Sequence, residues 1–143
     1  MVRRRFIVLG ILSFVALCGA QVGKYVFSQI VCNDGVGFGI GGGVWPLVFE
    51  GCFIGGIWFF LFRELRAEIS SRFIFLVLMG GGFLLGGALS NLLDRLIFGC
   101  VSDYFQPFLW FPAFNIADIC VSMGAGLLFI YFFYRDFVLK QME

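Results

Sequence analysis

Asp103 and Asp118 are the two side chains in this chain whose type and spacing could perform chemistry. They stand out because only nine of the 143 residues are acidic while 61% are hydrophobic, and a carboxylate beside lipid is costly. The loop between them is long enough to fold one carboxylate back onto the other. Two close carboxylates share a proton, so one can take a proton from water while the other donates one to a scissile bond. The pattern predicts hydrolysis by an aspartate pair.

The composition excludes several other chemistries. Histidine is absent, which removes Ser-His-Asp and Cys-His nucleophiles and every histidine-based metal site. We therefore expect neither a metal nor a cofactor. The net charge of +1, without a basic patch, predicts no nucleic-acid partner.

The hydropathy pattern predicts an integral membrane protein of one domain, residues 1–143. Only 13% of the residues are charged, and four apolar stretches each approach the roughly 20 residues that cross the hydrocarbon core as a helix. These expected spans cover about residues 6–23, 44–62, 73–93 and 114–134. The expected fold class is an all-α membrane protein with four transmembrane helices.

Basic residues set the expected orientation. Eight of them precede the first span, lie between the second and third spans, or follow the fourth, and only Lys24 and Arg95 lie on the other side. By the positive-inside rule both termini face the cytoplasm. Asp103 and Asp118 then lie near the extracytoplasmic face.

Two further patterns bear on the architecture. Residues 24–43 combine Tyr25, Val26 and other aromatic or β-branched residues with glycines, which predicts a small extracytoplasmic β-rich segment. Small residues four apart within the spans predict close helix packing; examples are Gly51 with Gly55 and Gly82 with Gly86.

Cysteine placement leaves one question open. The five cysteines form no Cys-x-x-Cys pair, but Cys32 and Cys100 fall in the two loops expected on the outer side. A disulfide between them is compatible with this placement, although sequence alone does not establish connectivity.

Asn115 and Asp118 lie three residues apart at the start of the fourth span, where a helix places them on one face. They fit a helix N-cap followed by an acid in the first turn. They equally fit a catalytic carboxylate with a neighbouring amide, and the two interpretations are compatible.

The end of the third span carries a second polar group. Asp94 opposes the dipole at this helix C-terminus, and we expect it to form a structural ion pair with the adjacent Arg95. Asn91 precedes Asp94 by three residues and could share its face. Glu50, inside the second span, is a functional candidate by default, with Arg95 and Lys24 as candidate partners.

Four short motifs together resemble those of the lipoprotein signal peptidases (signal peptidase II), which are bacterial intramembrane aspartic proteases. In chain order they are Asn33-x-Gly35-x-x-Phe38-Gly39, Asn91-x-x-Asp94-Arg95, Gly99-x-Val101-x-Asp103-Tyr104 and Phe114-Asn115-x-Ala117-Asp118. Each motif alone is weakly specific, but their order and spacing on four spans are specific. Two positions depart from the family pattern: Ala20 replaces an expected Asp, and Ile119 replaces a common Ser.

The resemblance implies an aspartic endopeptidase of the bacterial inner membrane that cleaves prolipoproteins before a diacylglyceryl-modified cysteine. Asp103 and Asp118 would be its catalytic pair. The residues implied to bind substrate or shape the site are Asn33, Gly35, Asn91, Asp94, Arg95 and Asn115. Membrane lipid and globomycin-type inhibitors are further implied partners, and residues 24–43 would form a β-cradle over the helices.

The protonation of the pair can be predicted from the helix direction. The fourth span enters from outside, so its positive N-terminal end lies close to Asp118 and favours the ionised form. Asp118 is then the base, and Asp103 carries the proton.

Two other classes of function fit parts of the sequence. A small four-span channel or transporter subunit would also be rich in glycine and phenylalanine, but its polar residues should continue across the bilayer. A Ser-Lys hydrolase could use Lys24 with Ser28 or Ser90, although neither serine stands in a recognisable nucleophile motif.

Overall fold

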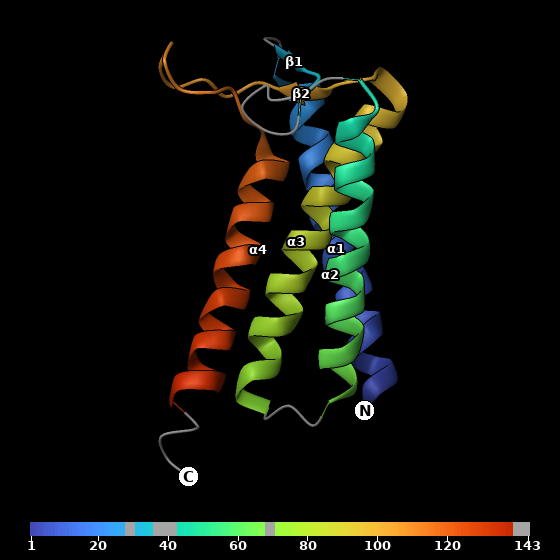
Figure 1. Ribbon diagram of the computed structural model, residues 1–143, viewed down its shortest axis with the longest axis vertical. Helices are drawn as coiled ribbons and strands as arrows, with labels where there is room; N and C mark the ends of the chain where they lie inside the picture. Colours follow the sequence, from blue (N-terminus) through green and yellow to red (C-terminus); the bar gives the residue numbers. More distant parts are fainter. Residues whose placement is uncertain (28–30, 36–42, 68–70, 139–143) are drawn as a thin grey trace.

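The computed structural model describes residues 1–27, 31–35, 43–67 and 71–138, and its helices run side by side along one axis (Figure 1). The helices are α1 (Val2–Val26), α2 (Trp45–Arg66), α3 (Ser71–Phe98) and α4 (Ile116–Phe133), which continues as a π-helical turn, η1 (Tyr134–Val138). Two strands, β1 (Val31–Asn33) and β2 (Val101–Asp103), lie together at one end of the bundle, called here the sheet end. The start of α1 and the end of α4 lie at the opposite end.

The predicted membrane spans are confirmed. All four helices are long and apolar enough to cross a membrane, so this is a multi-pass membrane protein. The helices extend beyond most of the predicted limits because arginines at their ends are good helix formers that can reach the polar interface. The fourth begins later than predicted, at Ile116, because Asn115 caps it.

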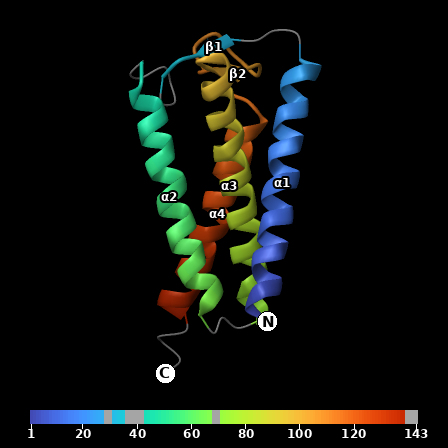
Figure 2. The same cartoon turned by 90° about the vertical axis from the view of Figure 1, so that its right-hand side faces the viewer.

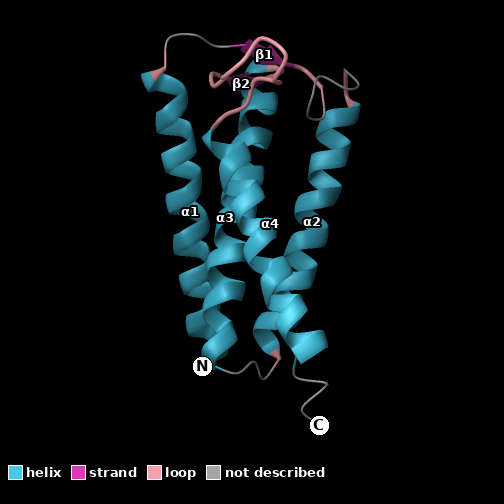
Figure 3. Ribbon diagram, turned by 90° about the vertical axis from the view of Figure 1, so that its left-hand side faces the viewer, coloured by secondary structure: helices cyan, strands magenta, loops and turns pink. Residues whose placement is uncertain are grey.

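α3 lies against the other three helices and holds the bundle together (Figures 2 and 3). Lipid supplies little hydrophobic drive for helix association, so close packing of small residues has to provide it. A Cβ on Gly124 would lie 2.5 Å from the Leu84 backbone nitrogen of α3. A Cβ on Gly86 would overlap the Ser13 carbonyl of α1, and one on Gly82 would lie 2.6 Å from the Leu12 Cβ of the same helix. The predicted close contact at Gly82 and Gly86 is therefore confirmed.

The same prediction is wrong for Gly51 and Gly55. Nothing lies within 4 Å of a Cβ built on either residue. Their four-residue spacing matches the packing pattern, but that pattern does not say which helix face meets a neighbour.

The β-rich segment is confirmed in a form that sequence did not predict. β1 pairs antiparallel with β2, with Val31 opposite Asp103 and Asn33 opposite Val101. The second strand comes from the loop after α3, not from residues 24–43. Within that range, Tyr25 and Val26 belong to α1, so their assignment to a strand is wrong. Residues 28–30 and 36–42 lie outside the described residues.

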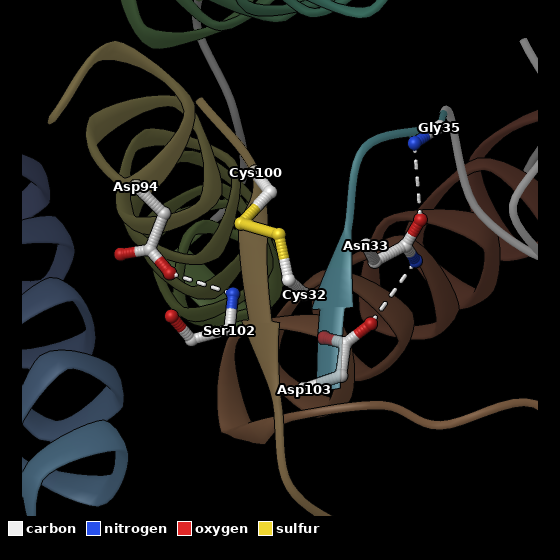
Figure 4. The surroundings of a disulfide bond; sticks show 7 residues. All are labelled: Cys32, Asn33, Gly35, Asp94, Cys100, Ser102 and Asp103. Carbon is white, nitrogen blue, oxygen red and sulfur yellow. Dashed lines mark hydrogen bonds between the residues drawn. A yellow bond between two sulfur atoms is a disulfide. The ribbon is translucent and has the colours of Figure 1, made fainter. Parts of the chain in front are cut away.

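A disulfide between Cys32 and Cys100 fastens this sheet to the end of α3 (Figure 4). Strands of three residues in a two-stranded sheet are marginal by themselves. Gly99, with φ +78°, makes the turn that leads from α3 into Cys100 and β2. The disulfide therefore fixes β1 beside the strand that carries Asp103.

The end of the bundle away from the sheet has its own buried charge. Glu64 of α2 is 5% exposed. It accepts hydrogen bonds from the Tyr131 hydroxyl at 2.7 Å and from Nη1 of Arg135 at 3.0 Å. Between this group and the sheet end lies an apolar core that includes Leu61, Leu84 and Leu128.

Gly86→Ala tests the close packing of α1 on α3. The added methyl group has to push against backbone, so we expect a loss of about 1–3 kcal/mol of stability and a lower Tm in detergent. Gly55→Ala is the matched control because its Cβ meets nothing within 4 Å. Equal Tm values for the two variants would contradict the assigned packing.

Candidate active site

The predicted site residues converge at the sheet end. A cavity of about 500 Å³ is bordered there by residues from β1, α3, β2, the loop before α4, and α4 itself. Its polar lining consists of Asn33, Asn91, Arg95, Asp103, Asp118 and Ser122. Asp103 ends β2 and Asp118 lies in the first turn of α4, so the fold brings both acids to one cavity.

Asp103 is buried and held by two amides. Its exposed fraction is 2%. Nδ2 of Asn33 donates to Oδ2 at 3.0 Å, and Nδ2 of Asn115 donates to Oδ1 at 2.7 Å. Burial raises the pKa of the Asp103 carboxyl above its ordinary value, and the charge of Asp118 acts in the same direction, while the two amide bonds oppose the rise.

Asp118 is less buried and belongs to a capping box. Its backbone nitrogen donates to Oδ1 of Asn115 at 3.1 Å, and its Oδ2 accepts from the Asn115 backbone nitrogen at 2.9 Å. Its other oxygen, Oδ1, accepts from Nδ2 of Asn91 at 2.9 Å. The predicted helix cap is thus confirmed, and the carboxylate also borders the cavity.

Asn115 contacts both acids. Its side-chain amide donates to Asp103, its backbone nitrogen donates to Asp118, and the amide also lies 3.3 Å from Oδ1 of Asn91. Asn115 is fully buried. One residue therefore sets the positions of the two carboxylates relative to each other.

The predicted ion pair between Asp94 and Arg95 is wrong. Asp94 accepts from Lys24 at 3.0 Å, and it also accepts from the Ser102 backbone nitrogen at 2.9 Å and from Gln21 at 3.2 Å. Adjacent residues of a helix point in different directions, so the two side chains meet different neighbours. Asp94, 1% exposed, ties α1 to α3 and to the start of β2.

Arg95 faces α2 instead. Its Nη1 lies 2.8 Å from Oε2 of Glu50, and its Nη2 donates to the Gly35 carbonyl at 2.7 Å. Of the two candidate partners for Glu50, Arg95 is the one that pairs with it. Glu50, Arg95 and Asp118 also border a smaller cavity of about 150 Å³.

The structure gives roles to supporting residues for which the sequence analysis predicted none. Gln21 donates to Ser90 and Asp94, and the Tyr104 hydroxyl accepts from the Ile116 backbone nitrogen at 3.1 Å. Ala20, where the family pattern expects Asp, is completely buried. Ala20 and Lys24, four residues apart, share one face of α1, and both are buried in the structure.

Lys24 does lie 3.1 Å from the Ser90 hydroxyl, as a Ser-Lys hydrolase would require. Ser90 is fully buried, and Lys24 pairs with Asp94. Neither residue borders the cavity that holds the two aspartates. This contact is structural, and Ser28 lies outside the described residues. In the described part of the chain, no group of three or more His, Cys, Asp or Glu side chains could hold a metal ion.

Fold and site together define a class: a four-helix membrane protein with a carboxylate-containing cavity at one end of the bundle. A model of the signal peptidase (SPase) II family matches residues 6–134. The lipoprotein signal peptidase of Symbiobacterium thermophilum is 38% identical over 109 residues, covering 72% of this chain and 67% of that protein. That of Syntrophus aciditrophicus is 33% identical over 120 residues, covering 78% and 68%. The chain belongs to the signal peptidase II family.

Two further comparisons bear on extent and fold. The match to the lipoprotein signal peptidase of Halothermothrix orenii has 44% identity but covers only 43% of this chain and 41% of that protein. A bacterial membrane enzyme structure, determined by the in meso method at 2.3 Å resolution, superposes with a TM-score of 0.67 over 85% of each chain at 23% identity. That likeness supports the fold.

Removing the disulfide tests what holds the sheet in place. Because it closes a long loop, with a sequence separation of 68, we expect the double variant Cys32→Ser/Cys100→Ser to lose about 2–4 kcal/mol of stability. Thermal unfolding in detergent with and without reductant measures this. The control is Cys52→Ser, which alters an exposed free cysteine. A reductant-induced drop in Tm that persists in the double variant would contradict the assignment.

Proposed function

We propose that this protein is an aspartic endopeptidase that removes signal peptides from diacylglyceryl-modified prolipoproteins, with Asp103 and Asp118 as its catalytic pair. Membership of the signal peptidase II family supports the substrate class. The observation that carries the assignment of residues is that both carboxylates border one cavity and both are bonded to Asn115.

The proposed chemistry needs only these two acids and a water molecule. The ionised Asp118 takes a proton from the water molecule while the oxygen of that water attacks the scissile carbonyl carbon. Asp103, protonated, donates its proton to the carbonyl oxygen. The tetrahedral intermediate then collapses: the carbonyl re-forms, the C–N bond breaks and the amine leaves with a proton from Asp118, while Asp103 regains its proton.

Different environments support these different roles. Burial holds the proton on Asp103 by raising its pKa. Asp118 lies in the first turn of α4, and its carboxylate accepts from two N–H donors, the Asn115 backbone nitrogen and the Asn91 side chain, which suits the role of the base. Environments that differ in this way assign acid and base within a carboxylate pair.

The cavity lining fits a lipidated peptide. Phe111, Pro112, Phe114, Ile119 and Met123 supply an apolar wall beside the polar group. Acyl chains and the apolar part of a signal peptide favour such a wall. Globomycin-type inhibitors are expected to occupy the same cavity.

We place the sheet end outside the cytoplasm and both termini inside, in the bacterial inner membrane. The excess of arginine and lysine near the other end supports this orientation. The Cys32–Cys100 disulfide supports it independently, because disulfides persist in the oxidising compartment outside the cytoplasm.

Asp103→Asn and Asp118→Asn test the catalytic pair. Purified protein is given a diacylglyceryl prolipoprotein, and release of the signal peptide is followed. We expect each substitution to lower the rate by about 10²- to 10⁴-fold, as the loss of an acid or base does, without lowering the Tm to a matching degree.

Asp136→Asn, at the other end of the bundle, is the control acid and should cleave normally. Failure of the wild type to cleave, or normal cleavage by both active-site variants, would sink the proposal. Ion flux through liposomes containing the protein would then favour the channel.

The pH dependence of cleavage tests the role of Asp103. Its pKa is raised from 3.8. As the pH rises, Asp103 therefore stays protonated up to a higher pH than an exposed aspartate does, and this proton is the one that it must donate. Activity should therefore fall as pH rises through this raised pKa. Asn33→Ala removes a bond that stabilises the ionised form, so the falling limb of kcat/KM against pH should move upward. A limb that stays in place or moves downward would argue against Asp103 as the acid.

A further inference from the structure

Glu50 is a partly buried charge to which the proposed mechanism gives no task. It lies within α2, and its side chain is 12% exposed. An acid inside a membrane span is costly and marks a function by default. Its partner Arg95 neutralises it at 2.8 Å, but neutralisation alone does not explain why a charge pair stands beside the site.

The contacts of Arg95 continue toward the site. While Nη1 binds Glu50, Nη2 donates to the Gly35 carbonyl at 2.7 Å. Among the described residues, Nε is buried and has no hydrogen-bond partner. The two terminal nitrogens therefore hold the guanidinium. Within the described part of the chain, loss of Glu50 would leave it with the Gly35 bond alone.

Gly35 transmits this constraint to Asn33. The Gly35 backbone nitrogen donates to Oδ1 of Asn33 at 3.1 Å, and Nδ2 of Asn33 donates to Asp103 at 3.0 Å (Figure 4). A backbone N–H can only donate, so it has to face the amide oxygen. That leaves the NH₂ group directed at Asp103. A turned amide would set its oxygen against the carboxylate.

We propose that Glu50 is a positioning residue for the proposed cleavage. Glu50 holds Arg95, and Arg95 holds the backbone at Gly35. That backbone in turn keeps the Asn33 amide donating to Asp103. The inference rests on the proposed function, because it assigns Glu50 a role only if Asp103 takes part in the reaction. It also gives α2, otherwise outside the aspartate network, a link to the reacting group.

Glu50→Gln keeps the size of the side chain but removes its charge. A loosened Asn33 misplaces Asp103, so kcat should fall by about 10- to 100-fold, the scale of a reacting group displaced by about 1 Å. KM should change far less, since Glu50 acts on the acid and not on the cavity wall. Glu64→Gln is the matched control: it removes a buried, Arg-paired acid at the other end of the same helix, so it should lower the Tm and leave kcat unchanged.

A double-mutant cycle separates positioning from a general loss of structure. In an Asn33→Ala background the last link is already gone, so adding Glu50→Gln should change kcat by less than about twofold. Glu50→Asp, which keeps the charge, supplies the same comparison if the Gln variant does not fold.

The outcomes are distinguishable. Suppose first that wild type cleaves and Asp103→Asn does not. The role of Glu50 is then overturned if the position-50 variant has a normal kcat, or if its loss of kcat is the same with and without the Asn33 side chain. A wild type that does not cleave, or an active Asp103→Asn, overturns the proposed function itself.

Discussion

The hydrogen bonds of Asn115 are the interaction on which the site depends. Its side chain caps α4 through the Asp118 backbone nitrogen and at the same time donates to Asp103. Starting the last helix and assembling the two acids are therefore one structural event. Because Asn115 is fully buried, water cannot substitute for either bond without a cavity opening.

The charged residues around this centre are paired across helices. Lys24 of α1 meets Asp94 of α3, and Glu50 of α2 meets Arg95 of α3. Breaking a buried pair strands a charge in a low-dielectric environment, which costs more than the pair contributes when intact. The pairs therefore act mainly to specify how three helices meet at the sheet end, and α3 is the helix common to both.

The two strands at the sheet end are stabilised by different means. They are too short to be stable alone, so the disulfide and the bond from Ser102 to Asp94 attach them to α3. Because Asp103 lies in β2, this attachment also fixes the position of Asp103. A covalent link thus holds the strands in place, whereas close helix packing at Gly86 and Gly124 holds the bundle together.

The sequence by itself determined the four spans, because bilayer thickness dictates how long an apolar run must be. It also predicted Asp103 and Asp118 as candidate site residues, because acids in so apolar a chain are costly and therefore few, and the motif resemblance added their amide neighbours. Only the tertiary structure decided the partners. Arg95 binds Glu50 and not Asp94, and β1 pairs with a strand from beyond α3. Such contacts depend on which helix face meets which neighbour, and spacing along one chain segment carries no information about the segment opposite.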